Sequence, residues 1–284
     1  MSPLLGAHMS IAGGVELAPI QGGKVGCEII QLFTKNSNQW DAKPITDDHA
    51  RLFKENMKKN EIQLAFAHDS YLINLASPDP ALHKKSLNAF IHELERAEKL
   101  GLMALVFHPG SHVGKGEEYA IQKIADSVNQ AHQKTPHYKV LTCFENAAGQ
   151  GSNVGHRFEH LAKLIELVED KKRIGVCFDT QHAFAAGYDL RTEEGYKKVW
   201  EEFDEIIGLK WLKCFHLNDS KKGFGSRVDR HEHIGKGELG LTAFRCLMND
   251  PRFKHHPMSL ETPKGPDLKE DVENLAMLRG LIKK

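Results

Sequence analysis

Short apolar runs recur along the chain, and the last residue of each lies 25 to 45 residues after the last residue of the run before it. Three runs share a local form, CFE at 143–145, CFD at 177–179 and CFH at 214–216, and VFH at 106–108 is closely related. In a β-strand, residues i and i+2 face the same side, so each terminal side chain points with the small residue two positions earlier and away from the intervening Phe. The runs predict eight strands, which end at His8, Phe33, His68, His108, Glu145, Asp179, His216 and Glu261.

The segments between these runs have the 3.6-residue period and the boundary residues of helices. Segment 79–100, for example, carries Pro80 near its start and is followed by Gly101. The predicted helices cover 13–24, 46–60, 79–100, 117–133, 156–170, 192–207, 241–249 and 267–283. Eight strand–helix units in 284 residues predict an α/β fold, one (β/α)8 TIM barrel, with 1–284 as a single domain and its functional site at the C-terminal strand ends.

Composition limits the setting in which the protein works. The 38 basic and 38 acidic side chains cancel, so contact with a polyanion would depend on a local patch or on bound metal. No basic segment with a long apolar core opens the chain, and no run approaches the roughly 18 to 20 apolar residues of a membrane span. The five cysteines contain no CxxC pair, which is typical of reduced thiols. We expect a monomer without membrane contact, in the cytoplasm or nucleoid of a bacterium.

Histidine is the compositional outlier, with 17 residues. A single His or Asp at a strand end often anchors a loop through hydrogen bonds, but many converging imidazoles and carboxylates are costly to bury unless a cation neutralises them. His156 and His160, spaced i and i+4, offer a separate metal pair, for which the sequence identifies no carboxylate partner. The candidate ligands near the strand ends are His68, His108, Glu145, Asp179, His182, His216, Asp229, His231 and Glu261.

Nine mixed nitrogen and oxygen ligands are too many for one tetrahedral ion and suit two or three ions that share bridging carboxylates. Ligation by His with Asp or Glu but without Cys favours zinc or manganese over calcium or magnesium. A multinuclear site of this kind favours the hydrolysis of phosphate esters. The HExxH and GxSxG motifs are absent, GSHVGK at 110–115 falls short of a P-loop, and GQGSNVG at 149–155 does not match GxGxxG.

Nine motifs, in order along nearly the whole chain, resemble the endonuclease IV family of apurinic/apyrimidinic endonucleases. They are GAHMSIAGG (6–14), QLFTKN (31–36), HDSYLINLASP (68–78), FHPGSHVG (107–114), ENAAGQGS (145–152), FDTQHAFAAGYD (178–189), FHLNDS (215–220), DRHEHIGKGELG (229–240) and LETP (260–263). The resemblance implies a zinc enzyme on a TIM barrel that cuts double-stranded DNA on the 5′ side of an abasic site. The expected products are a 3′-hydroxyl and a 5′-deoxyribose phosphate, and the removal of 3′ blocking groups is also implied.

The resemblance also implies a distribution of the ligands over three zinc ions, one of which could be replaced by manganese. The first ion would be held by His68, His108 and Glu145, the second by Glu145, Asp179, His216 and Glu261, and the third by His182, Asp229 and His231. The residues expected to be catalytic are Glu145, Glu261 and His182. Such a cluster activates the attacking water and offsets the negative charge that develops on the phosphoryl and leaving oxygens.

Loops at the strand ends are expected to read the DNA. Tyr71 and Leu72 match the family residues that enter the minor groove at the lesion, and an apolar wedge costs least where a base is already missing. Packing within their own loop is the alternative for these two residues. Lys35 and Arg230 are candidate phosphate contacts beside the site. Asn38 stands where some family members carry an Arg that inserts into the base stack, so weaker stacking is expected from this loop.

Two other functions remain open from the sequence. Glu145, Asp179, His216 and Glu261 alone would make a single-metal site like that of xylose isomerase-like sugar isomerases and epimerases, which leaves the other five candidate ligands without a role. A catalytically silent protein that only binds the lesion is the second alternative. In that case a Glu261→Gln variant would bind DNA as well as the unaltered chain, and no activity would be lost.

Overall fold

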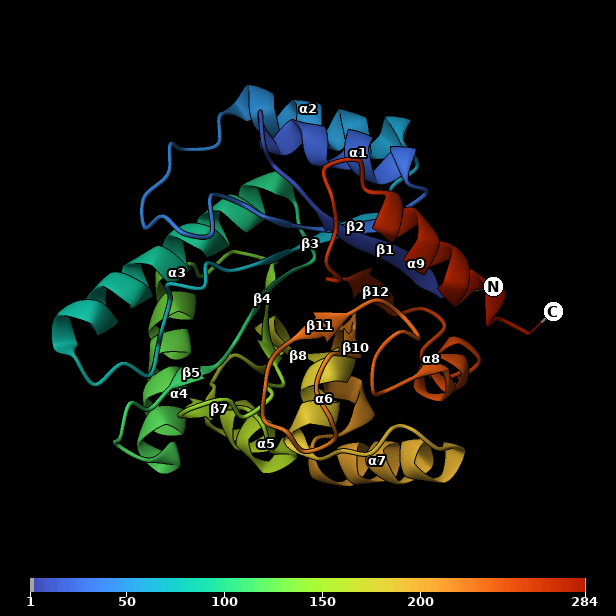
Figure 1. Ribbon diagram of the computed structural model, residues 1–284. Coiled ribbons are helices and arrows are strands. Elements are labelled where there is room, and N and C mark those ends of the chain that lie inside the picture. Colours follow the sequence, from blue (N-terminus) through green and yellow to red (C-terminus); the bar gives the residue numbers. More distant parts are fainter. Residues whose placement is uncertain (1–2, 284) are drawn as a thin grey trace.

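The computed structural model describes residues 3–283 and contains a closed barrel of eight parallel strands surrounded by helices (Figure 1). The order around the barrel is β1-β12-β9-β8-β6-β4-β3-β2, so each strand pairs with its sequence neighbours in the barrel and β1 closes the ring against β12. The strands are β1 (Leu4–Met9), β2 (Ile29–Phe33), β3 (Leu64–His68), β4 (Ala104–Phe107), β6 (Leu141–Glu145), β8 (Ile174–Asp179), β9 (Leu212–Leu217) and β12 (Pro257–Leu260). The predicted TIM barrel is confirmed, and every predicted strand end lies within one residue of the observed end.

Helices cover the outside of the barrel at the predicted places. They are α1 (Ala18–Lys24), α2 (Asp47–Lys59), α3 (Pro80–Leu100), α4 (Glu117–Lys134), α5 (Phe158–Leu167), α7 (Glu193–Ile206), α8 (Leu241–Met248) and α9 (Lys269–Gly280), with 3-10 turns at Val15–Leu17, Lys171–Arg173 and Leu209–Trp211. Helix α3 illustrates the local cause: the Asp79 carboxylate accepts hydrogen bonds from two N–H groups of the first turn, and Gly101 ends the helix in the left-handed conformation. The boundary residues in the sequence therefore set where this helix begins and ends.

One helix was not predicted. Helix α6 (Thr180–Ala186) follows β8 directly, and its N-cap is the candidate ligand Asp179, whose Oδ1 accepts from the His182 N–H at 2.8 Å.

The predicted helix 156–170 begins later than expected, at Phe158, so His156 lies before the helix instead of one turn from His160. The i, i+4 spacing of this pair is thus not a helical spacing.

The alternation of side chains along the strands is as predicted. Cys143, Cys177 and Cys214 are buried in the barrel interior beside Phe66 and Val106, one layer below the polar strand ends. The Phe residues between each Cys and its ligand instead join the large core between barrel and helices; these are Phe144, Phe178 and Phe215. Because side chains alternate across a strand, burial of the Phe against the helices directs each terminal polar group into the barrel mouth.

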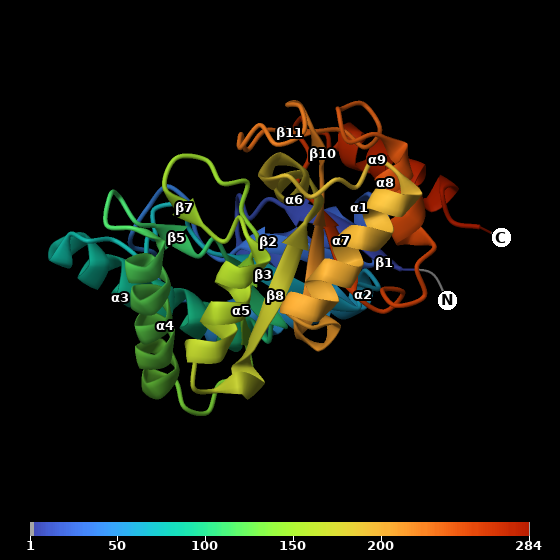
Figure 2. The ribbon, with the colours of Figure 1, turned by 90° about the horizontal axis from the view of Figure 1, so that it is seen from below.

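The loops at this end of the barrel carry two small two-stranded sheets, which lie with α6 in the upper half of the molecule in Figure 2. Strand β5 (Gly110–Ser111) pairs with β7 (Asn153–Val154), and β10 (Asp219–Ser220) pairs with β11 (His231–Glu232). Among residues 3–283, no helix combines the length and apolar character required to cross a membrane.

Candidate metal centre

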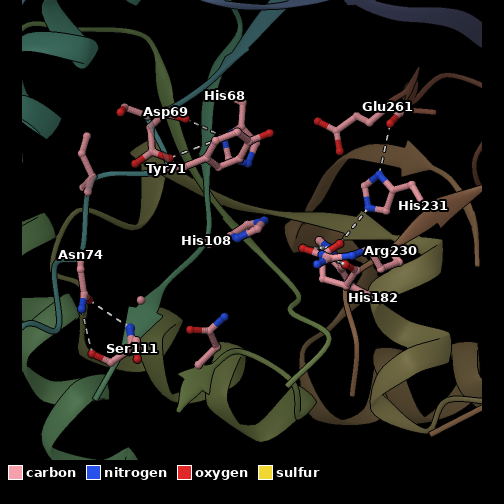
Figure 3. A pocket seen from close by; sticks show the side chains of 15 residues that line it. His68, Asp69, Tyr71, Asn74, His108, Ser111, His182, Arg230, His231 and Glu261 are labelled. Atoms are coloured by element: carbon pink, nitrogen blue, oxygen red, sulfur yellow. Dashed lines mark hydrogen bonds and ion pairs between the residues drawn. The ribbon is translucent and has the colours of Figure 1, made fainter. Parts of the chain in front are cut away.

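A pocket of about 600 Å³ opens at the C-terminal ends of the strands, and six of the nine candidate ligands line it (Figure 3). Its lining combines ligands from β3, from the loop after β4 and from α6 with residues of the 229–231 segment and Glu261. Tyr71, Asn74, Ser111 and Arg230 complete the rim. The structure therefore gathers residues up to 193 positions apart, from His68 to Glu261, in one mouth.

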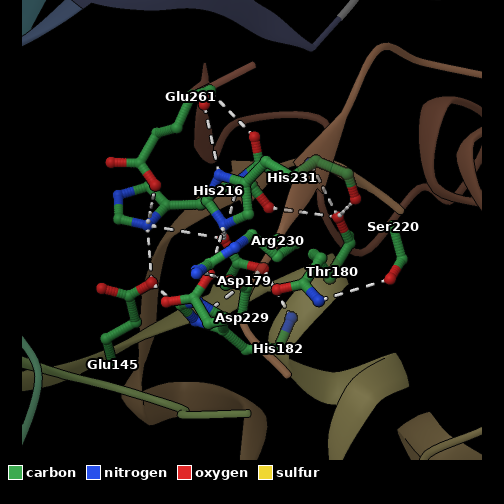
Figure 4. Close-up of polar contacts among 12 residues, drawn as sticks. Glu145, Asp179, Thr180, His182, His216, Ser220, Asp229, Arg230, His231 and Glu261 are labelled. Carbon is green, nitrogen blue, oxygen red and sulfur yellow. Dashed lines mark hydrogen bonds and ion pairs between the residues drawn. The ribbon is translucent and has the colours of Figure 1, made fainter. Parts of the chain in front are cut away.

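Glu145, at the end of β6, occupies the centre of the group and is fully buried. Its Oε2 lies 3.1 Å from His68 Nε2 and 3.3 Å from His108 Nε2. Its Oε1 lies 2.9 Å from His216 Nδ1 (Figure 4). The two carboxylate oxygens therefore face different imidazoles. A carboxylate in this position can bridge two cations.

Two further groups flank Glu145. In the first, His216 Nδ1 lies 3.3 Å from Glu261 Oε2 and 3.9 Å from Asp179 Oδ2, so one imidazole nitrogen faces three carboxylates. In the second, Asp179, His182 and His231 lie close enough for a shared ion. Asp229 reaches this second group from the loop before β11. Its Oδ2 lies 3.3 Å from His182 Nε2, and its Oδ1 lies 3.3 Å from His231 Nε2.

Backbone carbonyls set the orientation of three imidazoles. The Nδ1 atoms of His68, His182 and His231 lie 2.9, 2.9 and 3.2 Å from the carbonyl oxygens of Asp69, Asn146 and Glu261. A carbonyl can only accept a hydrogen bond, so each Nδ1 carries a proton, and each Nε2 is the nitrogen that can bind a cation once its own proton is released. The buried Nε2 atoms of His182 and His231 have no hydrogen-bond partner among the described residues. This arrangement fits metal ligation, in which the remote nitrogen of a ligating His is held by a second hydrogen bond.

The charges of the site perturb one another strongly. Burial alone would lower the pKa of His68 and of His216, but the neighbouring carboxylates outweigh it and raise each pKa to about 9. Burial would raise the pKa of Glu261, but His216 outweighs it and lowers the pKa to about 2. The same opposition holds the pKa of Asp229 well below its usual range, through His182 and His231. Glu261 and Asp229 are therefore ionised, and a cation that binds here displaces protons from His68 and His216.

Uncharged amides position the carboxylates, and the sequence reasoning did not select them. Gln31 donates to Glu261 Oε1 at 2.6 Å, and Asn218 donates to Asp179 Oδ2 at 2.7 Å. Asn146 accepts from the Asp179 N–H at 2.7 Å. All three amides are buried. Asn146 and Asn218 follow candidate ligands at the ends of β6 and β9, which was the signal available in the sequence, whereas Gln31 lies within β2 and offered no such signal.

The expected DNA-reading residues divide between surface and interior. Tyr71 is 63% exposed on the pocket rim, with its ring centroid 5.4 Å from that of Phe33 and 5.7 Å from that of His68. Asn38 and Arg230 are exposed, and Leu72 is half-buried. Tyr71 and Arg230 line the pocket, whereas Leu72 and Asn38 are not part of its lining.

Lys35 departs from the expectation. It is only 3% exposed, its Nζ lies 3.2 Å from Glu93 Oε1, and it donates to the Gln39 carbonyl at 2.6 Å. Because its ammonium is enclosed by protein acceptors, Lys35 does not offer its charge to a phosphate.

His156 and His160 meet a carboxylate outside the pocket, that of Glu117 at the start of α4. Glu117 lies 3.6 Å from His156 Nε2 and 3.2 Å from His160 Nε2. However, His160 Nδ1 accepts a hydrogen bond from the Gly155 N–H and Nε2 accepts one from Arg157 Nε at 3.0 Å, so both ring nitrogens already have partners within the chain. The geometry therefore favours a hydrogen-bonded link between the 146–156 loop and α4 over a metal site.

Comparisons with known proteins agree with this architecture. The family model described as xylose isomerase-like TIM barrel matches residues 23–281. A probable endonuclease 4 of Geobacter sulfurreducens is 52% identical over 284 residues, which cover 100% of this chain and 96% of that protein. The crystal structure of endonuclease IV from Thermus thermophilus superimposes with a TM-score of 0.87 at 34% identity, with 98% of each chain covered.

A D-tagatose 3-epimerase-like protein has a TM-score of 0.73, with 99% of this chain and 98% of that chain covered. At 16% identity this likeness concerns the fold alone. The relative from Geobacter, in contrast, is similar over the whole length that carries the nine motifs. The chain belongs to the endonuclease IV family, on the xylose isomerase-like TIM barrel.

Proposed function

We propose that the protein is a metal-dependent apurinic/apyrimidinic endonuclease of DNA repair. It hydrolyses the phosphodiester 5′ to an abasic site in duplex DNA and leaves a 3′-hydroxyl and a 5′-deoxyribose phosphate. The observation that carries this proposal is the convergence of His68, His182 and His231, each held by a backbone carbonyl at Nδ1, on one pocket lined by carboxylates. Membership of the endonuclease IV family supplies the substrate class.

The donor set suits three zinc ions, with manganese as a possible replacement at one of them. His68, His108 and Glu145 would hold the first, and Glu145, Asp179, His216 and Glu261 the second. His182, Asp229 and His231 would hold the third, since Asp229 contacts both imidazoles. Asp179 Oδ2 of the second group lies 4.0 Å from His231 Nε2 of the third group, which supports two adjacent ions. When bound, zinc lowers the pKa of a coordinated water and neutralises charge on a phosphodiester.

The chain itself orients these groups. Glu145 bridges the first two groups, Gln31 holds Glu261 and Asn218 holds Asp179, so the carboxylates keep their positions when a charged phosphate arrives. Glu145, Glu261 and His182 are the proposed catalytic residues. Tyr71 and Arg230 line the pocket. Tyr71, together with the adjacent Leu72, fills the gap left by the missing base, and Arg230 neutralises a backbone phosphate. Asn38 makes a weaker, uncharged contact from the neighbouring loop.

The same pocket suits the removal of 3′ blocking groups, because the end of a DNA strand occupies no more space than a continuous DNA strand. A single-metal sugar isomerase is disfavoured by the five additional candidate ligands, which that reaction does not require. The natural partner is therefore damaged double-stranded DNA, and the proposed setting is a monomer in the bacterial cytoplasm or nucleoid.

The decisive experiment is incision of a duplex that carries one tetrahydrofuran abasic analogue, with analysis of the product ends. This analogue cannot undergo β-elimination, so a lyase gives no product. A 3′-hydroxyl end, lost in a Glu261→Gln variant that still binds the duplex, supports metal-dependent hydrolysis. Absence of incision by protein that contains three zinc ions per chain would refute the proposal. Equal lesion binding with no activity in either protein would identify a silent lesion binder.

A further inference from the structure

A buried ion pair lies behind the two loops that face the DNA in the proposed function. Lys35 follows β2, and Glu93 lies in the middle of α3; they are 3% and 1% exposed, and their charged atoms are 3.2 Å apart. Neither residue lines the pocket or belongs to the candidate metal ligands. Burial of a charged pair seldom improves stability over an apolar pair of the same size, so its position in the fold calls for another reason.

The Glu93 carboxylate is bonded to both loops at once. Its Oε2 accepts from the Thr34 hydroxyl at 2.9 Å, on the loop that carries Asn38. Its Oε1 accepts from the Ser70 N–H at 3.0 Å, on the loop that carries Tyr71. The Ser70 hydroxyl in turn donates to the Ser37 carbonyl at 2.5 Å, so the two loops are also joined directly. A carboxylate can accept from Thr34, Ser70 and Lys35 together. An apolar residue at this position could accept none of these hydrogen bonds.

Arg96, one turn after Glu93 on α3, holds the first loop at its two ends. It is buried, it donates to the Thr34 carbonyl, and its Nη1 donates to the Lys43 carbonyl at 2.7 Å. The segment between Thr34 and Lys43 is thus attached to α3 at both ends, with Asn38 exposed at its tip. Two charged residues on the buried face of α3 therefore determine where this loop stands.

We propose that Lys35, Glu93 and Arg96 form a clamp that fixes the two DNA-facing loops relative to each other and makes them specific for an abasic site. These are positioning residues, since none of them touches the substrate or the metal ligands. Tyr71 follows Ser70 directly, so a shift of the Ser70 backbone moves the wedge relative to the pocket. The inference rests on the proposed function and adds what sets its lesion specificity.

The test compares three variants of the full-length, zinc-loaded chain. Glu93→Gln removes the charge and leaves Lys35 buried without its partner, while the double variant Glu93→Leu/Lys35→Met removes the whole pair. The matched control is Glu98→Gln on the same helix, since the Glu98 carboxylate also accepts two backbone N–H groups, those of Lys139 and Val140, but at the opposite end of the barrel. Each protein is assayed for zinc content, melting temperature, kcat and KM, and Kd for abasic and undamaged duplexes.

A duplex with 2-aminopurine beside the abasic site reports insertion of the wedge, because unstacking raises its fluorescence. We expect Glu93→Gln to keep its zinc and most of its kcat, to lose the fluorescence change, and to bind the abasic duplex roughly ten- to hundred-fold more weakly, the loss expected when a stacking side chain no longer meets its base. The double variant should recover melting temperature relative to Glu93→Gln but not affinity, because leucine at position 93 offers no acceptor to Thr34 or Ser70. Glu98→Gln should lose stability alone.

Three results would overturn the clamp. The first is a Glu93→Gln variant with unchanged abasic Kd and fluorescence response, and the second is loss of zinc and kcat with affinity retained. The third is recovery of affinity together with melting temperature in the double variant, which would indicate a purely structural pair. Failure of the proposed function would look different, since the unaltered protein would then fail to incise the duplex. If that protein still binds the abasic duplex, the Kd and fluorescence measurements on the variants still test the clamp. If the unaltered protein neither incises nor prefers the lesion, both proposals fall.

Discussion

Replacement of Tyr71 by Ala tests whether the exposed ring reads the lesion or packs within its own loop. The side chain is 63% exposed, and its main neighbours are the rings of Phe33 and His68 at centroid distances of 5.4 and 5.7 Å. An aromatic pair contributes about 0.5–1.5 kcal/mol, and the exposure of this one favours the lower end. We therefore expect the free energy of unfolding to fall by less than about 1 kcal/mol.

The expected effect on DNA binding is larger. Stacking of an aromatic ring on a nucleic acid base is worth about 1–3 kcal/mol, which corresponds to a loss of roughly 5- to 150-fold in affinity at 1.4 kcal/mol per tenfold. If the ring acts only in lesion recognition, the affinity of the variant for the abasic duplex should fall by this factor, and its affinity for the undamaged duplex should change little. The zinc content should stay unchanged, because Tyr71 is not among the candidate ligands.

Affinity can be measured by fluorescence anisotropy with labelled duplexes in a Glu261→Gln background, which keeps the substrate intact. The matched control is Tyr119→Ala, since Tyr119 is 36% exposed on α4 and lies outside the pocket lining. Abasic affinity within twofold of the unaltered protein, or an equal loss for undamaged DNA, would refute the wedge. A loss of stability as large as the loss of binding would instead favour packing within the loop.

Three further outcomes follow from the site. Asn38→Arg should tighten abasic binding, because a longer charged side chain at this exposed tip reaches the base stack; an unchanged Kd would contradict the expectation. Gln31→Leu removes the 2.6 Å hydrogen bond to Glu261 and should lower kcat about 10- to 100-fold with KM little changed, and kcat within twofold would argue against an orienting role. In protein stripped of metal, the pKa values of His68 and His216 are about 9, above the usual 6.5. The ion pairs of these imidazoles with the carboxylates therefore stabilise the folded state fully below pH 6.5, and this stabilisation is lost as the pH rises through 9. The melting temperature of the stripped protein should therefore fall between pH 7 and 10, and a flat or rising profile would count against these ion pairs.

Much of the barrel is a direct consequence of local patterns. The CFE, CFD and CFH runs alternate sides in any extended conformation, so the ligand and the Cys face one way and the Phe the other before any tertiary contact forms. Helix α3 likewise begins at Asp79–Pro80 and ends at Gly101 for reasons contained in those residues. Helix α6 escaped prediction because it is short and is capped by Asp179, a residue already read as a strand end and ligand.

The sequence by itself determined the strands, most helices and the polar residues at the strand ends, because these depend on periodicities of two and 3.6 residues and on neighbours a few positions away. The partners of those polar residues depended on tertiary structure. Lys35 reads as a surface charge in its loop, yet it pairs with Glu93, 58 positions later, and is buried. Gln31 reads as an ordinary strand residue, yet it orients Glu261 across the closure of the barrel. Contacts between residues so distant in sequence arise only when the barrel closes, because no local pattern records which strand end or helix face will lie opposite.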